Sequence, residues 1–340
     1  LLYDEMSPDV ERLFETAVPI IKLCLQFGEY EKARALIGTL KVPAGDKSRQ
    51  TELFMLEGKL SLLTNQYERS IQKYQQAAQL YSELNDKRGL ASAYNNLGII
   101  AHEQRQTEPG REYFEKARSL SDYHEDENLK MSILVNLGVV HLIHGESEKA
   151  LEIFNSLFQQ FNDSSQAQLF LLNLNKGLAE RDNGDYKQAL QSLSKAMDIA
   201  KNLNDQRHIG TATFNLAEIH ILSGEIEKGN NLLIQAFKIF SNLYDAVRIA
   251  DTYRVFGLLH MKQGYFELAE SELRISLRVN KEKGNTLNLA ETYYAYSKLA
   301  EKQGNQTDQE VYLRKSLSFC QSMQATRRIE RIQEELDALQ

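Results

Sequence analysis

The stretch LNKGLAERDNGDYKQAL, residues 174–190, contains the pattern on which the fold depends. In it Gly177 is followed seven residues later by Gly184, and an acidic and an aromatic residue come next. A small residue returns along the chain at Gly58, Gly98, Gly138, Gly177, Ala217, Gly257 and Ser297, separated by 40, 40, 39, 40, 40 and 40 residues. A fixed period of this length predicts a solenoid of stacked repeats, in which each unit is stabilised by its neighbours.

Each period is predicted to form two helices. Between residues 90 and 130, Ala93, Leu97 and Ile100 recur at the spacing of one helical face, and Tyr113, Phe114, Ala117 and Leu120 form a second such stripe. A glycine inside a helix costs about 1 kcal/mol relative to alanine. The recurrence of Gly98 and its equivalents therefore indicates a close approach of the partner helix.

Composition and charge limit the class of protein. The 340 residues carry a net charge of −7, and Pro numbers only 4. The acidic excess lies in residues 1–169, with 25 acidic and 18 basic side chains, whereas residues 170–340 hold 22 of each. This distribution disfavours a nucleic-acid binder, because phosphate neutralisation requires a basic stripe. It leaves open whether the acidic half favours a basic partner or is only a set of solvated helix faces.

The remaining sequence signals favour a cytoplasmic protein without membrane contact. The longest apolar runs are too short to cross a bilayer, and no N-terminal signal pattern is present. Cys24 and Cys320 lie near opposite ends of the predicted solenoid, so a bridge between them is not expected. Because the sequence begins at Leu1 instead of Met, we expect it to be a fragment of a longer chain.

The motifs YNNLG (residues 94–98) and GDYKQAL (residues 184–190) resemble tetratricopeptide repeats. The resemblance extends over nearly the whole chain, although each unit is six residues longer than the standard 34. This long variety is similar to the repeats of kinesin light chains, bacterial peptide-pheromone receptors and the helical arrays of bacterial signalling regulators. The resemblance implies an all-α fold, an α-α superhelix of about eight helix pairs with a C-terminal capping helix.

The repeat frame also predicts the organisation of the chain. Residues 1–50 form a degenerate N-terminal repeat or cap, and residues 51–323 form seven repeats that start near 51, 91, 131, 170, 210, 250 and 290. Residues 324–340 form the capping helix, in which Ile329, Ile332, Leu336 and Leu339 share one face.

A binding site is predicted from a residue type that recurs two positions before the small residue. Asparagine occupies this position in four consecutive units, as Asn96, Asn136, Asn175 and Asn215. In kinesin light chains and O-linked GlcNAc transferase a similar asparagine ladder on the concave face holds the backbone of an extended peptide, and an amide offers the matching donors and acceptor. Flanking pockets are expected at Phe214, Arg254 and Tyr294. The alternative is that asparagine is common in the repeat consensus and merely solvated.

One variant of peptide binding is excluded by the same positions. Clamps for chaperone C-terminal carboxylates need basic residues around the asparagines, but the preceding positions hold Asn95, Val135, Leu174 and Phe214. The first arginine, Arg254, comes too late in the chain for such a clamp.

No catalytic, cofactor or metal motif is recognised. Phosphate-binding glycine motifs, metal-spaced Cys/His clusters and nucleophile elbows are missing from the sequence. His141, His220 and His260 each follow the small residue by three positions, which predicts packing between the two helices of a unit. Equivalent residues of successive units lie roughly 10 Å apart, too far for a shared metal ion with ligand distances of about 2 Å.

These observations predict a non-enzymatic module that binds a peptide or extended protein segment in its concave groove. One alternative is a sensory or regulatory array of a larger bacterial signalling or transcription protein whose output domain is absent. Another is an assembly scaffold that uses the convex face. The sequence specifies neither the ligand nor the oligomeric state.

Overall fold

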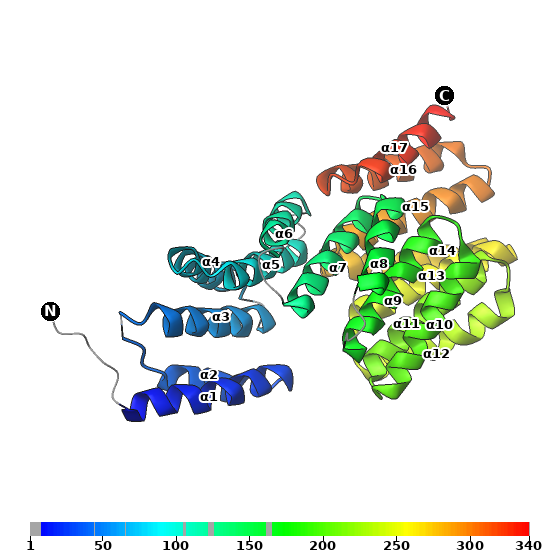
Figure 1. Ribbon diagram of the computed structural model, residues 1–340. Helices are drawn as coiled ribbons and strands as arrows, with labels where there is room; N and C mark the ends of the chain where they lie inside the picture. Colours follow the sequence, from blue (N-terminus) through cyan, green and yellow to red (C-terminus); the bar gives the residue numbers. More distant parts are fainter. Residues whose placement is uncertain are drawn as a thin grey trace. The chain divides into compact units, whose positions relative to one another are not determined.

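The computed structural model describes residues 8–43, 45–64, 66–104, 107–121, 126–160 and 165–339. Within these ranges the chain forms seventeen α-helices and no strand, joined by short turns (Figure 1). The predicted all-α repeat fold is therefore confirmed. By contact density the chain divides into unit 1, Leu1–Ile133, and unit 2, Leu134–Gln340.

The helices follow one another in pairs. Unit 1 contains α1 (Pro8–Gln26), α2 (Tyr30–Thr39), α3 (Lys47–Leu63), α4 (Tyr67–Glu83), α5 (Lys87–Glu103), α6 (Thr107–Ser121) and the start of α7 (Glu127–Ile143). Unit 2 continues with α8 (Ser147–Gln160), α9 (Gln166–Asp182), α10 (Tyr186–Asn202), α11 (Gln206–Leu222), α12 (Ile226–Asn242), α13 (Ala246–Gln263), α14 (Phe266–Glu282), α15 (Thr286–Lys302), α16 (Gln306–Ser322) and α17 (Thr326–Asp337).

The recurring glycines face bulky side chains of the second helix of their pair. A Cβ atom built on Gly138 would lie 2.3 Å from the ring of Phe154, and one on Gly98 would lie 2.6 Å from the ring of Phe114. The equivalent distance from Gly177 to Leu193 is 2.7 Å. Contacts below 3.0 Å require a shift of the neighbour, so these positions exclude larger residues unless the helices separate. The close helix approach expected from the sequence is confirmed.

The turns have a clear local basis. Between the two helices of a pair, Gly184 adopts φ of +82°, a left-handed conformation that glycine reaches without strain. Between pairs, an aspartate begins the next helix: Asp205 accepts a hydrogen bond of 3.0 Å from the backbone N–H of His208, and Asp245 does the same for Arg248 at 3.1 Å. Both turn types recur among the described turns: Gly145, Gly224, Gly264 and Gly304 also have positive φ, and Asp46 and Asp86 cap the next helix in the same way, whereas Ser165 and Asn285 take this place before α9 and α15.

Unit 1 begins with a small apolar core at its N-terminal end. Phe14 and Ile21 of α1 are buried with Ala33 of α2 and Leu56 of α3. The following pairs, α3 with α4 and α5 with α6, are stacked as successive layers (Figure 1). Exposed apolar residues of α1 lie outside this core, namely Leu13, Ile20 and Leu23.

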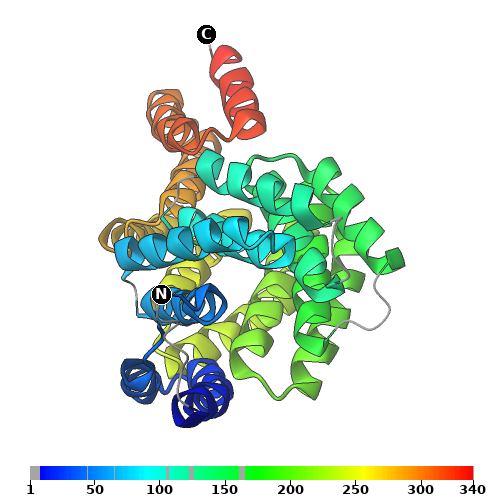
Figure 2. The ribbon, with the colours of Figure 1, turned by 60° about the vertical axis from the view of Figure 1, so that its left-hand side comes forward.

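The helices of unit 2 follow a curved path that returns to its starting turn. Both views show the curve running from α8 to α17 (Figures 1 and 2). The backbone N–H of Arg327 in α17 donates to the carbonyl of His144, in the turn after α7, at 3.2 Å. Nε of Arg328 donates to the carbonyl of Ile143 at 3.1 Å. Unit 2 is therefore closed by its last helix.

Helix α17 also covers the end of the apolar core. Ile332 and Leu336 are buried against Leu313, Leu317 and Cys320 of α16. The solenoid core would otherwise end in water at this point.

Deleting residues 327–340 is expected to destabilise α15 and α16. Leu313 and Leu317 lose their cover, and burying one leucine is worth about 1.5–3 kcal/mol. Hydrogen exchange should show lower protection in both helices. Glu330→Ala, at an exposed position of α17, serves as the control and should preserve the protection. Unchanged exchange in the truncated chain would contradict a capping role.

Candidate functional site

A hollow of about 360 Å³ lies in unit 2, on the face formed by the first helices of successive pairs. We call this surface the first-helix face; α9, α11, α13 and α15 supply most of the lining, and α16 and α17 complete it. The charged lining residues are Arg181, Glu218, Arg254, Glu291, Lys298, Arg328 and Arg331. The apolar ones are Leu222, Leu258, Ala290, Ala295 and Ile332. Tyr294, Ser316 and Cys320 are also present.

Six of the charged residues in and beside the hollow form a closed ring of ion pairs. The charge ring consists of Asp182, Arg181, Glu218, Arg254, Glu291 and Arg328. Glu218 accepts from Arg181 at 2.6 Å and from Arg254 at 3.0 Å. Glu291 lies 3.3 Å from Arg254 and 3.6 Å from Arg328. Asp182 lies 3.9 Å from Arg328 and 2.7 Å from Arg181, so the circuit returns to its start.

The spacing of the charge ring in the sequence explains its path across the helices. Arg181, Glu218, Arg254, Glu291 and Arg328 are separated by 37, 36, 37 and 37 residues. Each step is three or four residues shorter than the repeat of 40. Each member therefore lies about one helical turn nearer the N-terminus of its helix than the member before. The ring consequently crosses the first helices diagonally and reaches α17.

Electrostatics favours the charged forms of Glu218 and Arg254 despite their burial. Burial alone would raise the pKa of the Glu218 carboxyl, which is 5% exposed, but the guanidinium groups of Arg181 and Arg254 outweigh this and lower the pKa. Burial disfavours the charged form of Arg254 too, yet Glu218 and Glu291 raise its pKa. Three guanidinium groups and three carboxylates thus balance within the ring.

A second polar cluster lies at the edge of the hollow. The hydroxyl of Tyr294 donates to Glu335 at 2.5 Å and accepts from Arg331 at 2.7 Å. Lys298 lies 2.9 Å from the other oxygen of Glu335. Burial and the hydrogen bond to Glu335 raise the pKa of Tyr294. These contacts join α15 to α17 beside the charge ring.

Asp251 is a buried carboxyl near the charge ring. Its Oδ1 accepts a hydrogen bond from Nδ2 of Asn288, and Asp251 as a whole is 8% exposed. Burial raises the pKa of Asp251 to about 7, although Arg248 and Arg254 act in the opposite direction.

Asp251→Asn is expected to increase stability more at pH 8 than at pH 4. The pKa of folded Asp251 lies above its unfolded value of 3.8, so the folded state favours the protonated carboxyl. The stability contributed by Asp251 is present below pH 4 and is lost as pH rises to about 7. The asparagine side chain of the variant does not ionise, so the variant avoids this loss of stability. Its amide oxygen still accepts the hydrogen bond from Asn288. Thermal melting of the variant from pH 4 to 8 measures the difference, with the exposed Asp198→Asn as control. A constant difference between variant and wild type would contradict the assignment.

The structure places the predicted asparagines at different depths. Asn96 lies in unit 1, on α5, where its Nδ2 donates to the carbonyl of Ser92 at 2.8 Å. Asn215 of α11 is 5% exposed and donates in the same way to Thr211 at 2.8 Å. Asn136 of α7 and Asn175 of α9 are half-buried. One N–H of Asn96 and of Asn215 is thus used within its own helix.

The three predicted flanking residues also differ in their positions. Arg254 and Tyr294 both line the hollow. The ring of Phe214, by contrast, is buried in the core, with its centroid 6.4 Å from that of Phe240. Sequence reasoning missed Arg181, Glu218, Glu291 and Arg328, because it compared positions at intervals of 40 residues. The alternation of basic and acidic residues at intervals of 36 or 37 was the available signal.

The three aligned histidines each pair with a carboxylate. Nδ1 of His141 lies 2.5 Å from Glu146, and Nδ1 of His220 lies 3.2 Å from Glu225. His260 contacts Glu272 at 2.7 Å. The pair of His260 and Glu272 joins α13 to α14, whereas Glu146 and Glu225 lie in the turns just before α8 and α12. In the part of the chain that the structure describes, no group of three or more His, Cys, Asp or Glu residues is arranged to hold a metal ion.

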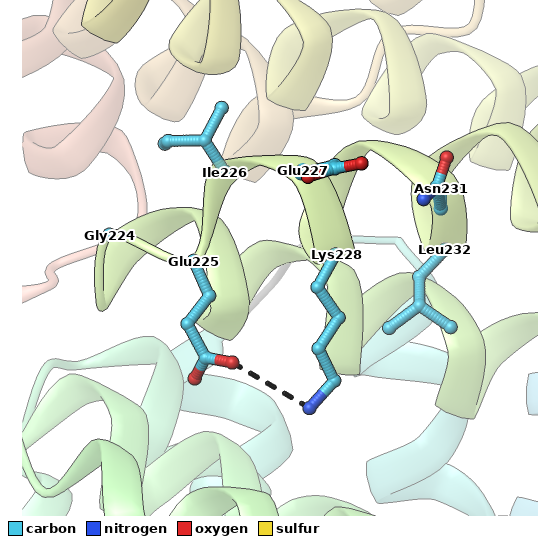
Figure 3. Close-up of a pocket in the computed structure, with 7 residues that line it drawn as sticks. All are labelled: Gly224, Glu225, Ile226, Glu227, Lys228, Asn231 and Leu232. Atoms are coloured by element: carbon cyan, nitrogen blue, oxygen red, sulfur yellow. Dashed lines mark ion pairs between the residues drawn. The ribbon is translucent and has the colours of Figure 1, made fainter.

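A second hollow is larger but less enclosed. About 710 Å³ lies beside Gly224–Leu232, a single segment at the start of α12 (Figure 3). Glu225 and Lys228 form an ion pair of 3.7 Å there. Because one segment provides the entire lining, a ligand would be contacted from one side only. We therefore take the hollow on the first-helix face as the candidate site.

Comparisons with known proteins agree with this architecture. Residues 91–162 and 168–242 match the tetratricopeptide repeat model. The structure is similar to a Rap protein complexed with competence and sporulation factor, at 13% identity, 96% and 99% coverage of the two chains and a TM-score of 0.65. It is also similar to the Rap conjugation gene regulator of plasmid pLS20 in complex with the Phr* peptide, at 15% identity, 94% and 97% coverage and a TM-score of 0.66.

A curated relative matches part of the chain. The RNA polymerase-associated protein CTR9 of Saccharomyces cerevisiae is 28% identical over 184 residues, which are 52% of this chain and 16% of the relative. The fold and the repeats define a helical repeat array, and its residues 91–162 and 168–242 are similar to tetratricopeptide repeats. Among the described helices, none is long and apolar enough to span a membrane.

Proposed function

We propose that the chain is a non-enzymatic binding module, which holds a peptide or extended protein segment on the first-helix face of unit 2. The observation that carries this proposal is the 360 Å³ hollow, where apolar side chains lie beside charged groups from several helices. Ligand sites in proteins are typically concavities of about 300–1,000 Å³ with a mainly apolar lining and a few polar groups.

The composition of the hollow suits a peptide. Leu222, Leu258 and Ile332 provide apolar surface for a side chain. Arg254 and Tyr294 provide polar groups at its wall. Asn175 of α9 is outside the lining, but its half-buried side-chain amide makes no hydrogen bond to any described residue, so both its donors and its acceptor are free for a peptide backbone. The structurally similar Rap conjugation gene regulator of plasmid pLS20 forms a complex with the Phr* peptide, which supports peptide binding as a function for this fold.

A regulatory role is a second candidate. One structurally similar protein is a conjugation gene regulator. In this alternative the peptide module is the sensory part of a larger signalling or transcription protein. A neighbouring catalytic or DNA-binding domain in the full gene would support it. Assembly through the convex face would instead leave the hollow without a ligand.

Leu258→Ala is expected to weaken peptide binding about tenfold. A peptide library displayed on phage would be selected against the full chain, and enriched peptides would be titrated calorimetrically. The loss of leucine contact is worth about 1.5–3 kcal/mol when fully buried, and 1.4 kcal/mol corresponds to a factor of ten. Asn175→Ala should remove a further 0.5–1.5 kcal/mol, roughly the net value of one hydrogen bond.

Lys228→Ala, in the hollow of Figure 3, provides the matched control and should bind as the wild type does. Full affinity in Leu258→Ala together with weaker binding in Lys228→Ala would move the site to α12. Failure of the selection to enrich any peptide would count against the binding function itself.

A further inference from the structure

We propose that the contact by which unit 2 closes on itself is a latch, and that its opening controls the access of a ligand to the hollow. This inference rests on the proposed function and adds the regulation of the same site. The hollow of about 360 Å³ lies at the lower end of the range of about 300–1,000 Å³ that is usual for ligand sites. An extended segment therefore gains room when the surrounding elements move apart.

The closure seam is the place where the two ends of the curve of unit 2 meet. We define it as the contacts of Arg327 and Arg328 with residues 143–145 and with Asp182. The hydrogen bond from Arg328 to Ile143 joins residues 185 positions apart in the sequence. Arg328 also lines the hollow, whereas Asp182 does not. Separation of the seam therefore widens the hollow at this wall without breaking the stacking of neighbouring helices.

The N-terminus of α17 depends on the seam for a hydrogen bond. The first N–H groups of a helix have no partner within that helix. Asp245 supplies a side-chain acceptor at the start of α13, whereas Ala325 at the start of α17 supplies none. The backbone N–H of Arg327 donates instead to the carbonyl of His144 at 3.2 Å. The exchange of this N–H consequently reports whether the seam is closed.

The charge ring is weakest where it crosses the seam. Asp182 and Arg328 are 3.9 Å apart, the longest of the six separations in the ring. Their side chains are 24% and 27% exposed, compared with 5% for Glu218. Coulomb attraction falls with distance, and salt screens exposed charges more than buried ones. We therefore expect this contact to open before the others of the ring.

The opposite side of α17 is held by apolar contacts. Ile332 and Leu336 are buried against α16, and Tyr294 of α15 donates a hydrogen bond to Glu335. Sodium chloride screens charges but does not weaken apolar burial as denaturants do. When the seam opens, α17 therefore remains attached to α15 and α16.

A salt titration of the wild-type chain tests the latch itself. Raising NaCl from about 0.1 M to about 1 M shortens the Debye length from about 10 Å to about 3 Å. Exchange of the Arg327 N–H, followed by NMR, should accelerate about fivefold, the upper limit for the loss of one partly exposed ion pair. The N–H of Arg248 also lies in a first helical turn, but its acceptor is the local Asp245, so its exchange should remain unchanged.

Cys320 is a natural probe of access to the hollow. It lines the hollow and is 2% exposed, so alkylation by N-ethylmaleimide requires an opening. Asp182→Asn removes the charge that Arg328 meets across the seam and should accelerate this alkylation about fivefold. The exposed Asp198→Asn should leave the rate unchanged. Cys24, in unit 1, is the internal reference in the same mass spectrometric measurement.

A covalent lock tests the converse. The Cβ position of Gly145 lies 3.1 Å from Cβ of Arg327, close to the 3.5–4.5 Å that a disulfide spans. The chain with Gly145→Cys and Arg327→Cys is compared in its oxidised and reduced forms, after peptide mapping verifies the bridge. Peptides enriched by the phage selection should associate at least about tenfold more slowly with the oxidised form. Reduction should restore the rate.

The outcomes separate the latch from the binding function. Unchanged exchange at Arg327 in high salt would overturn the latch. Faster exchange together with unchanged alkylation of Cys320 in Asp182→Asn would show that the seam opens without controlling access, and would also overturn the proposal. If the selection enriches no peptide, the proposed function fails, while exchange and alkylation still decide whether the seam controls the hollow.

Discussion

Replacing Glu218 with Gln is expected to lower the free energy of unfolding by about 3–5 kcal/mol, the usual loss when one member of a buried charge network is removed. Glu218 is 5% exposed, and it is the common partner of Arg181 and Arg254. Gln preserves the shape of the side chain but leaves two guanidinium groups without their shared carboxylate. Denaturant titration with hydrogen exchange in α9, α11 and α13 measures the effect.

The pH dependence provides a second test of the same substitution. The pKa of Glu218 is lowered in the folded chain, so its stabilisation is present above the unfolded pKa and is lost as pH falls through the folded value. The difference between wild type and Glu218→Gln should therefore shrink in acid. Glu310→Gln, in an exposed pair with Arg314, serves as control and should change stability by less than about 0.5 kcal/mol. An equally small effect of Glu218→Gln would mean that the ring contributes no stability.

Gly138→Leu is the second large expected effect. Even a Cβ atom at this position would lie 2.3 Å from the ring of Phe154, which is itself fully buried. Overpacking of a core typically costs about 1–3 kcal/mol, and the short distance favours the upper end of this range. Thermal melting should show a clearly lower midpoint than that of the wild type.

Gly38 offers a matched control for the packing argument. It also lies in a helix, but a Cβ atom there would meet nothing within 4 Å. Gly38→Ala should consequently leave the melting temperature unchanged or raise it slightly, because alanine has the higher helix propensity. Equal destabilisation by the two substitutions would indicate that glycine acts through the backbone and not through helix packing.

The fold was predictable because one position in each repeat has the same packing requirement, a small residue at a close helix contact. Gly98, Gly138 and Gly177 recur at a constant interval, and each permits the same close contact with Phe114, Phe154 or Leu193. A local requirement that is identical in every unit leaves a periodic trace in the sequence. The division of the chain at Ile133 leaves no such trace, because Met131–Val140 continues the usual helical pattern.

The candidate site was predictable only in part. Arg254 and Tyr294 were expected near the groove, and the structure places both at the hollow. Asn215 illustrates the limit: its residue type predicts peptide recognition, whereas the rotamer that bonds to Thr211 depends on packing around α11. Burial of Phe214 against Phe240 likewise depends on the neighbouring pair. Whether a polar side chain faces a ligand or its own helix is decided by tertiary contacts that periodicity does not encode.

Because the signs of the charge ring alternate along the chain, units between Arg181 and Arg328 can be lost in pairs but not singly without placing like charges side by side. Loss of the segment 206–245 would remove Glu218 and bring Arg181 beside Arg254, two like charges in a buried place. Loss of 246–285 would instead bring Glu218 beside Glu291. Removal of two adjacent units restores the alternation of sign, although the shortened curve must still reach the turn at Ile143. Tandem duplication and deletion of single units, the common way in which repeat proteins change length, are therefore disfavoured between Arg181 and Arg328.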